Sequence, residues 1–235
     1  MLLVEEMQNS GADAKLVGEL SRLSSLFGDR LPLERVWSQR GYDKFKSLAV
    51  SRQQELLKAL AGYYELVSGA LSSDPEALNS ESRLLRQVIR NMNLIISESV
   101  YSLIEKDDII EIYSKDLVQV YRGMGFMSIC NYTLLELLTH EFHELYERSQ
   151  QINGMMFEAV GRVAEVDMHE GLPVSNIPKH LMRELFSEDR GVFQVEFRYM
   201  FPLFVWPQKY FGFLVIQKAK VYQEPEIRKE SVHFL

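Results

Sequence analysis

VFQVEFRYMFPLFV (Val192 to Val205) and YFGFLVIQKAKV (Tyr210 to Val221) are the two stretches that decide the fold. Both are rich in aromatic and β-branched residues, which favour β-strands. The residues between them, Trp206-Pro207-Gln208-Lys209, include a proline and suit a turn. The spacing therefore predicts two long antiparallel strands joined as a hairpin. Apolar residues occupy both alternating sets of Val192 to Val205, so we expect both faces of that strand to be covered.

A second, shorter hairpin is predicted upstream. IIEIYS (Ile109 to Ser114) and LVQVYR (Leu117 to Arg122) alternate apolar and polar residues around Lys115-Asp116. A helical stretch is expected after it, from about Met127 to Gln150. The predicted order after residue 107 is strand, strand, helices and a long hairpin, which is typical of an α+β fold.

The first hundred residues have a helical period instead. Apolar residues recur every three or four positions, which predicts amphipathic helices. Gly28-Asp29 with Pro32 is expected to end the first helix, and Ser72-Ser73-Asp74-Pro75 to begin the third. The first two stripes consist of Leu16, Leu20, Leu23 and Phe27, and of Leu56, Leu60, Tyr63, Val67 and Leu71.

The third helix is expected to run from about Pro75 to about Lys106. At roughly 1.5 Å per residue it would exceed about 40 Å, more than a compact bundle needs. It could brace the chain internally or pair with a second copy. The sequence therefore predicts a homodimer, with a candidate dimer interface formed by Leu85, Val88, Met92 and Ile95.

One long segment carries a resemblance to a known family. DLVQVYRGMGFMSICNYTLLELLTHEFHELYER (Asp116 to Arg148) resembles the opening of a PAS domain, with Phe126 at the position of the family's aromatic residue. Asn131 to Leu137 stands where the family has a Gly-Tyr-Ser-x-x-Glu-Leu turn and helix, and the terminal hairpin resembles the last two PAS strands. The resemblance covers residues 107–222 and implies a PAS-like antiparallel sheet flanked by helices there. The helical period predicts a dimerisation or linker region at 1–106, and residues 223–235 are expected to form a C-terminal tail.

The PAS resemblance also implies a function. Such domains bind small ligands inside the sheet or its helical cap, or pair with other signalling proteins through the sheet. No cofactor can be named from the sequence. The candidate ligand-binding residues are Phe126, Phe157, Tyr199, Phe201, Phe204 and Phe213, which would equally suit a plain aromatic core.

The stretch LLTHEFHELYER (Leu137 to Arg148) suggests other chemistry. In the PAS interpretation it is one amphipathic helix. His140-Glu141-Phe142-His143 is one residue shorter than the His-Glu-x-x-His of zinc proteases, but His140, His143 and Glu144 could form a looser metal site. His140-Glu141-Phe142 also resembles the phosphorylated segment of sensor kinases, without the base, small polar residue and proline that follow there.

Composition limits the remaining function classes. The chain has 235 residues, 46% hydrophobic and 25% charged, with a formal charge of −7 and one cysteine, Cys130, expected to be a buried apolar residue. The sequence has no cluster of Lys and Arg residues that would bind nucleic acid, and no apolar run of about 20 residues that would span a membrane. Its first residues include acidic side chains, whereas a secretory signal begins with basic ones. We therefore expect a cytoplasmic, non-catalytic signalling or regulatory protein. A metal-dependent enzyme and a ligand-free adaptor are the alternatives.

Overall fold

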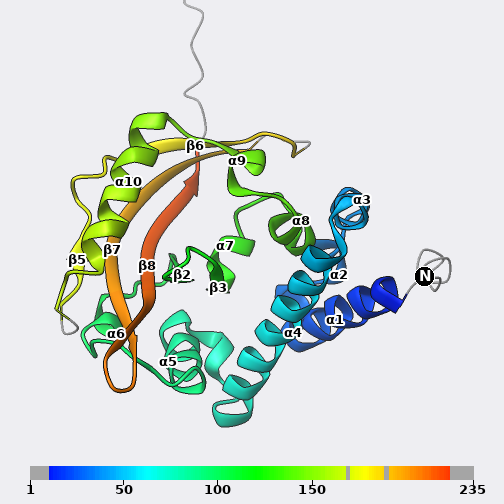
Figure 1. Ribbon diagram of the computed structural model, residues 1–235, viewed down its shortest axis with the longest axis horizontal. Coiled ribbons are helices and arrows are strands. Elements are labelled where there is room, and N and C mark those ends of the chain that lie inside the picture. The colour runs from blue at the N-terminus through cyan, green and yellow to red at the C-terminus, as the bar shows by residue number, and fades with distance from the viewer. Residues whose placement is uncertain (1–10, 168–169, 188–190, 223–235) are drawn as a thin grey trace, which may run out of the picture.

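The protein has the predicted α+β class. The computed structural model describes residues 11–167, 170–187 and 191–222. Helices make up most of the first half, and a curved antiparallel sheet follows (Figure 1). The tail predicted at 223–235 lies outside the described residues.

The terminal hairpin is confirmed and forms the middle of the sheet. Strands β7 (Val192–Val205) and β8 (Lys209–Val221) pair along almost their whole length, with a register irregularity between Phe197 and Tyr199. Gln208 in the turn has a φ of 101°. Both faces of β7 are largely covered, as its composition predicts, and the middle of β8 is buried on both faces as well.

The shorter hairpin is confirmed as well. It consists of β2 (Asp108–Ser114) and β3 (Gln119–Arg122), and β2 pairs with β8 from Asp108↔Lys218 to Ser114↔Gly212. The strand order is β3-β2-β8-β7-β6-β4, where β6 is His180–Glu184 and β4 is Tyr146–Glu147. Two short strands, β1 (Leu94–Ile95) and β5 (Leu172–Pro173), pair separately with β7. The strand β3 therefore lies at one edge of the sheet.

The register divides the side chains of the sheet between two faces. Glu111 and Tyr113 lie opposite Val215 and Phe213, and Gln217 follows on the same face, which we call the inner face. Ile112 and Tyr121 are paired on the opposite, outer face.

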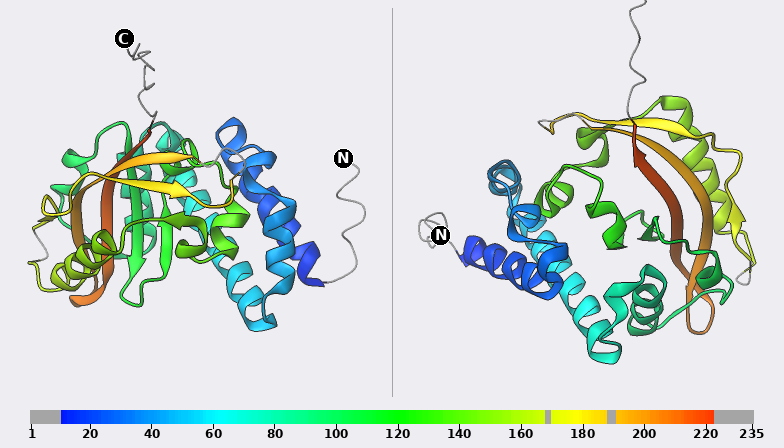
Figure 2. Two further views of the ribbon diagram at one scale, coloured as in Figure 1. Left: turned by 90° about the horizontal axis from the view of Figure 1, so that it is seen from above. Right: turned by 180° about the vertical axis from the view of Figure 1, so that it is seen from behind.

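The first two predicted helical stripes are confirmed. Helix α1 (Gly11–Phe27) and helix α4 (Val50–Ser73) pack against each other and bury most of their stripe residues. Between them lie η1 (Gly28–Arg30), α2 (Leu33–Val36) and α3 (Gln39–Ser47), of which α2 and α3 were not predicted. Figure 2 shows these helices on the side of the molecule opposite α10 (Gln150–Val163), which lies along β7.

The prediction of one long helix from Pro75 to Lys106 is wrong. Asp74 caps the end of α4, and η2 (Ala77–Asn79), α5 (Glu81–Asn91), β1 and α6 (Val100–Leu103) follow. The helix ends because Asn93 adopts a φ of 53° and the next residues pair with β7, Leu94 opposite Val205. Pairing with the sheet outweighs the helical period of this segment.

The proposed dimer interface is affected by this correction. Leu85 and Val88 are fully buried within the chain, and Met92 and Ile95 are half-buried. The stripe therefore packs against the chain's own core, and the homodimer stays a prediction without a continuous helix to support it.

The helical stretch predicted from about Met127 to Gln150 is divided further than expected. The segment contains α7 (Met124–Met127), α8 (Leu134–Thr139), α9 (Phe142–Leu145), β4 and the start of α10. His140 interrupts the helix with extended backbone, φ −106° and ψ 152°, and Tyr146 is extended where it pairs with Glu184. LLTHEFHELYER is therefore divided between the end of α8, the helix α9 and the strand β4, with His140 in the bend between the two helices and His143 within α9.

Among the described residues, no helix combines the length and apolar character that a membrane span requires.

The pairing of β2 with β8 predicts the effect of one substitution. A Cβ added at Gly212 would lie 2.0 Å from the carbonyl oxygen of Tyr113, so Gly212→Ala must push the two strands apart. We expect it to lower the free energy of unfolding by about 2 to 3 kcal/mol in urea denaturation. Gly154→Ala in α10 is the matched control, because no atom lies within 4 Å of the added Cβ. It should be neutral or stabilising by up to about 1 kcal/mol, and equal losses in both variants would contradict the strand contact.

Candidate functional site

A cavity of about 420 Å³ lies between the helical region and the β3 edge of the sheet. Helix α4 forms one wall, the edge strand β3 another, and α7 and α8 close the third side. Its lining is mostly aliphatic and includes Leu31, Ala59, Leu60, Gly62, Tyr63, Leu66, Met92, Val118, Gln119, Val120, Tyr121, Arg122, Met124, Met127, Leu134, Leu137 and Leu138. Its volume falls within the range of small-molecule pockets.

Tyrosines join the helical wall to the strand wall. The hydroxyl of Tyr63 in α4 donates a hydrogen bond of 2.6 Å to the carbonyl of Arg122 in β3, and the rings of Tyr63 and Tyr121 lie 6.1 Å apart. The Tyr121 hydroxyl is buried without a hydrogen-bond partner among the described residues. Burial, and then the nearby Glu81, raise the pKa of both phenols, so both keep their protons at neutral pH. Tyr121 thus supplies a buried hydroxyl to a largely apolar wall.

Glu81 fixes the position of α7. The backbone N–H of Gly125 donates to its Oε1 over 3.0 Å, and its Oε2 is buried without a partner among the described residues. A Cβ at Gly123 would lie 2.5 Å from that oxygen, so the absence of a side chain at residue 123 permits the contact. Burial raises the pKa of Glu81 although N–H groups of Gly125 and Met124 act to lower it. Through this contact α5 holds α7, and α7 brings Met124 and Met127 to the cavity.

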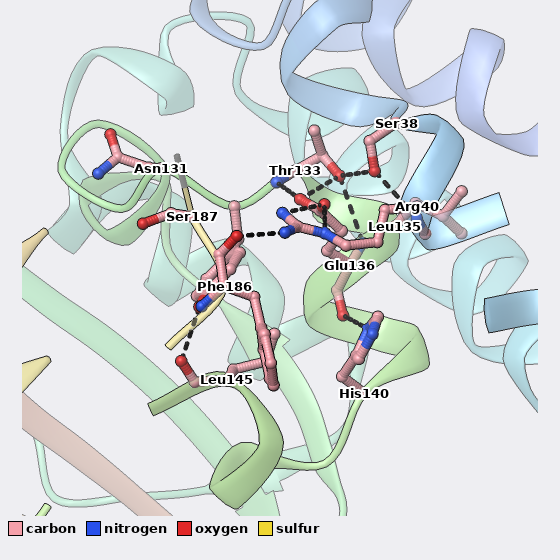
Figure 3. Close-up of polar contacts among 12 residues, drawn as sticks. Ser38, Arg40, Asn131, Thr133, Leu135, Glu136, His140, Leu145, Phe186 and Ser187 are labelled. Atoms are coloured by element: carbon pink, nitrogen blue, oxygen red, sulfur yellow. Dashed lines mark hydrogen bonds and ion pairs between the residues drawn. The ribbon is translucent and has the colours of Figure 1, made fainter. Parts of the chain in front are cut away.

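A polar cluster holds α8 against the helical region. Thr133 and Glu136 form a capping box at the start of α8, and Arg40 of α3 donates from Nε to Glu136 Oε1 over 2.7 Å. Figure 3 shows the Arg40 guanidinium between Glu136 and the carbonyl of Phe186, to which it also donates. Since Leu134, Leu137 and Leu138 of α8 line the cavity, this cluster positions that wall.

The charge on Glu136 is stabilised where it lies. Burial acts to raise the pKa of this carboxyl, but the hydrogen bond from the Thr133 N–H and the ion pair with Arg40 outweigh it. The net effect is a lowered pKa. The Glu136 side chain is 3% exposed, whereas that of Arg40 is 44% exposed, so the pair lies at the boundary between core and solvent.

The six predicted ligand-binding aromatics do not form one cluster, and none of them lines the cavity. Phe126 and Phe213 are buried on the inner face, beside Arg122 and Tyr113 respectively. The other four lie elsewhere. Tyr199 contacts Phe201 on the outer face, Phe204 contacts Tyr210 near the hairpin turn, and Phe157 of α10 is 65% exposed.

The sequence did not predict this cavity, although Leu60 and Tyr63 were assigned to an apolar stripe and Met92 to the candidate dimer interface. The lining residues come from segments between residues 31 and 138, and their only local signal is a pair of small residues, Ala59 and Gly62, beside the apolar stripe of α4. Small side chains within a helix that otherwise packs through large ones leave room for a pocket.

The candidate metal ligands have other partners. His140 Nδ1 lies 3.1 Å from the carbonyl of Glu136, and Glu144 forms an ion pair with Lys44 at 2.8 Å. His143 is exposed on α9. Within the described ranges, no group of three or more His, Cys, Asp or Glu side chains is arranged to hold a metal ion.

Comparison of the chain with models of protein families gives no match, and no curated protein is significantly similar to it. The PAS resemblance therefore stays a prediction.

The Arg40–Glu136 pair predicts a pH-dependent stability. The pKa of Glu136 in the folded protein lies below its ordinary value of 4.5. The ionised carboxylate therefore contributes its full share of the free energy of unfolding above pH 4.5, and this contribution is lost as the pH falls through the folded pKa. At pH 7 we expect Glu136→Gln to lower the free energy of unfolding by about 1 to 3 kcal/mol in urea denaturation. Below pH 4.5 the difference from the wild type should shrink. The control, Glu158→Gln on the exposed side of α10, should change little at any pH, and a gap that stays constant down to acid pH would contradict the assignment.

Proposed function

We propose that the chain is a non-catalytic regulatory protein whose ligand is a neutral, mostly apolar small molecule bound in the cavity beside β3. The observation that carries this proposal is the cavity itself, whose walls come from both halves of the chain. A ligand there contacts α4 of the helical region and β3 of the sheet at once. Its binding free energy therefore stabilises the packing of one half on the other.

The lining determines the class of ligand. Aliphatic side chains favour an acyl chain or a fused aromatic ring system. The described lining residues include no carboxylate, histidine, lysine or cysteine, so the cavity offers binding and no obvious acid and base pair. These features support ligand sensing over a metal-dependent enzyme.

The regulatory role rests on the connection between the two halves. The Tyr63 hydroxyl bonds the backbone of β3, and Arg40 bonds α8, so both walls of the cavity are tied to the helical region. A ligand that fills the space between these contacts restricts their relative movement. The state of the cavity is thereby coupled to surfaces available to other signalling proteins in the cytoplasm, or to a second copy of the chain.

The fold implied by the PAS resemblance is compatible with this proposal, but the ligand position that it implies differs from the cavity beside β3. The α+β arrangement and both hairpins agree with the expectation for residues 107–222. The resemblance implies a ligand inside the sheet or its helical cap, whereas the cavity lies along the edge strand, where the helical region meets the sheet.

The proposal predicts the effect of filling the cavity. Gly62→Leu adds a side chain at the lining of α4, where a Cβ meets no atom within 4 Å. We expect it to weaken binding of N-phenyl-1-naphthylamine, a neutral fluorescent aromatic probe, at least about tenfold. The measurement is a fluorescence titration at constant protein concentration.

Gly18→Leu is the matched control for this titration. Gly18 also lies in a helix, is exposed, and has no atom within 4 Å of an added Cβ, but it does not line the cavity. It should bind the probe as the wild type does. Equal affinities in Gly62→Leu and Gly18→Leu, or no binding by the wild type, would contradict the proposal.

A further inference from the structure

A buried guanidinium lies on the inner face of the sheet, apart from the cavity described above. Arg148 follows β4 and precedes α10. Its guanidinium donates to the thioether sulfur of Met156 in α10 and to that of Met182 in β6, the latter over 3.2 Å. Its Nε is buried without a hydrogen-bond partner among the described residues.

Thioether sulfurs are poor partners for this group. A guanidinium presents five N–H donors in a plane, which carboxylates match with two parallel hydrogen bonds, whereas a thioether is a weak single acceptor. Arg148 forms no ion pair with any described carboxylate. Burial lowers its pKa to about 10, although Tyr113 and Glu111 act to raise it. Within the described residues, the Arg148 guanidinium is thus a largely desolvated charge without a carboxylate in ion-pair contact.

The carboxylate that acts electrostatically on Arg148 already has other partners. Glu111 accepts hydrogen bonds from Tyr113, Gln119 and Gln217 and forms an ion pair with Arg122 at 3.2 Å. The charge of Glu111 is therefore shared with Arg122, and among the described residues no carboxylate forms an ion pair with Arg148.

A second unpartnered nitrogen lies beside it. His180 of β6 stacks on Phe197 at 5.8 Å between ring centroids, and the Arg148 Cζ lies 5.6 Å from the same ring. His180 Nδ1 is 3.0 Å from the carbonyl of Pro178, and its Nε2 is buried without a partner among the described residues. Arg148 and His180 therefore lie beside the same aromatic ring, and each has one buried nitrogen, Nε and Nε2 respectively, without a hydrogen-bond partner among the described residues.

We propose that Arg148 is the anchor of a second binding site, which takes a small carboxylate with an apolar body, and that His180 flanks it. The carboxylate replaces the Met156 sulfur on the guanidinium, because methionine has three rotatable bonds and can move aside. The body of the ligand lies against the side chains around the guanidinium, including Phe142, whose ring lies 4.9 Å from the Arg148 Cζ and which is 46% exposed. The partly exposed Phe142 provides the route from solvent.

The test uses benzoate as the carboxylate probe and benzamide as its neutral counterpart, each titrated into the full chain by calorimetry. Benzoate should bind at least about tenfold more tightly than benzamide, because only benzoate carries a negative charge that can pair with the Arg148 guanidinium. Arg148→Met should remove this preference. Arg162→Met, on an exposed part of α10, should leave it unchanged.

Two more variants test the sulfur contact and the independence of the two sites. Met156→Ala removes the sulfur that occupies the guanidinium and should tighten benzoate binding. Gly62→Leu, which fills the other cavity, should leave benzoate binding as it is, so the two proposals fail independently.

The folding of Arg148→Met supplies an independent readout. An apolar side chain of similar length in place of an unpaired buried charge is expected to keep or raise the melting temperature. A lower melting temperature together with unchanged benzoate binding would show that Arg148 is structural and overturn the proposal. Equal affinity for benzoate and benzamide, or no benzoate binding by wild type and Met156→Ala at about 10 mM, would overturn it as well.

Discussion

The pairing of β2 with β8 is the contact on which the rest of the structure depends. It joins residues about a hundred positions apart, from Asp108 opposite Lys218 to Ser114 opposite Gly212. The close approach at Gly212 leaves no space for a Cβ, and at the other end Arg198 and Lys218 form ion pairs with Asp108 and Glu105. Without this pairing β3 would have no place in the sheet, and α4 would have no edge to pack against.

The two proposed sites use the sheet in different ways. The apolar cavity lies along its β3 edge, and Arg148 lies on its inner face near the opposite edge strand, β4. The polar group around Glu111 lies on the inner face between them. Glu111 forms its ion pair with Arg122, which contributes to the cavity wall, and no described carboxylate forms an ion pair with Arg148. One buried carboxylate therefore influences the electrostatics of both sites.

The sequence predicted the parts of the fold that depend on local pattern. Both hairpins follow from alternation and turn residues, and α1 and α4 follow from their apolar stripes. The long third helix failed because its end depends on the left-handed Asn93 and on a two-residue pairing with β7, which no local period reveals. The division at His140 was missed for a similar reason, since the extended backbone there is set by packing.

The functional residues were harder to predict, because the cavity draws its lining from residues far apart in sequence. In LLTHEFHELYER the histidines suggested metal ligands, yet its last residue, Arg148, is the one with a buried nitrogen that lacks a hydrogen-bond partner among the described residues. The sequence alone does not reveal this, because the ion-pair partners of Arg148 and Glu111 are known only once the core is assembled.

The hydrogen bond from Tyr63 to Arg122 also protects the sheet. An edge strand with open backbone groups is a template for pairing with another chain, and here α4 covers part of β3 with its tyrosine hydroxyl on a strand carbonyl. Val118, just before β3, is 59% exposed, so apolar surface adjoins that edge. Any movement of α4 away from β3 would uncover a strand ready for intermolecular pairing. A molecule that holds α4 in place would therefore also act against self-association, since occupancy of the cavity and exposure of the edge exclude each other.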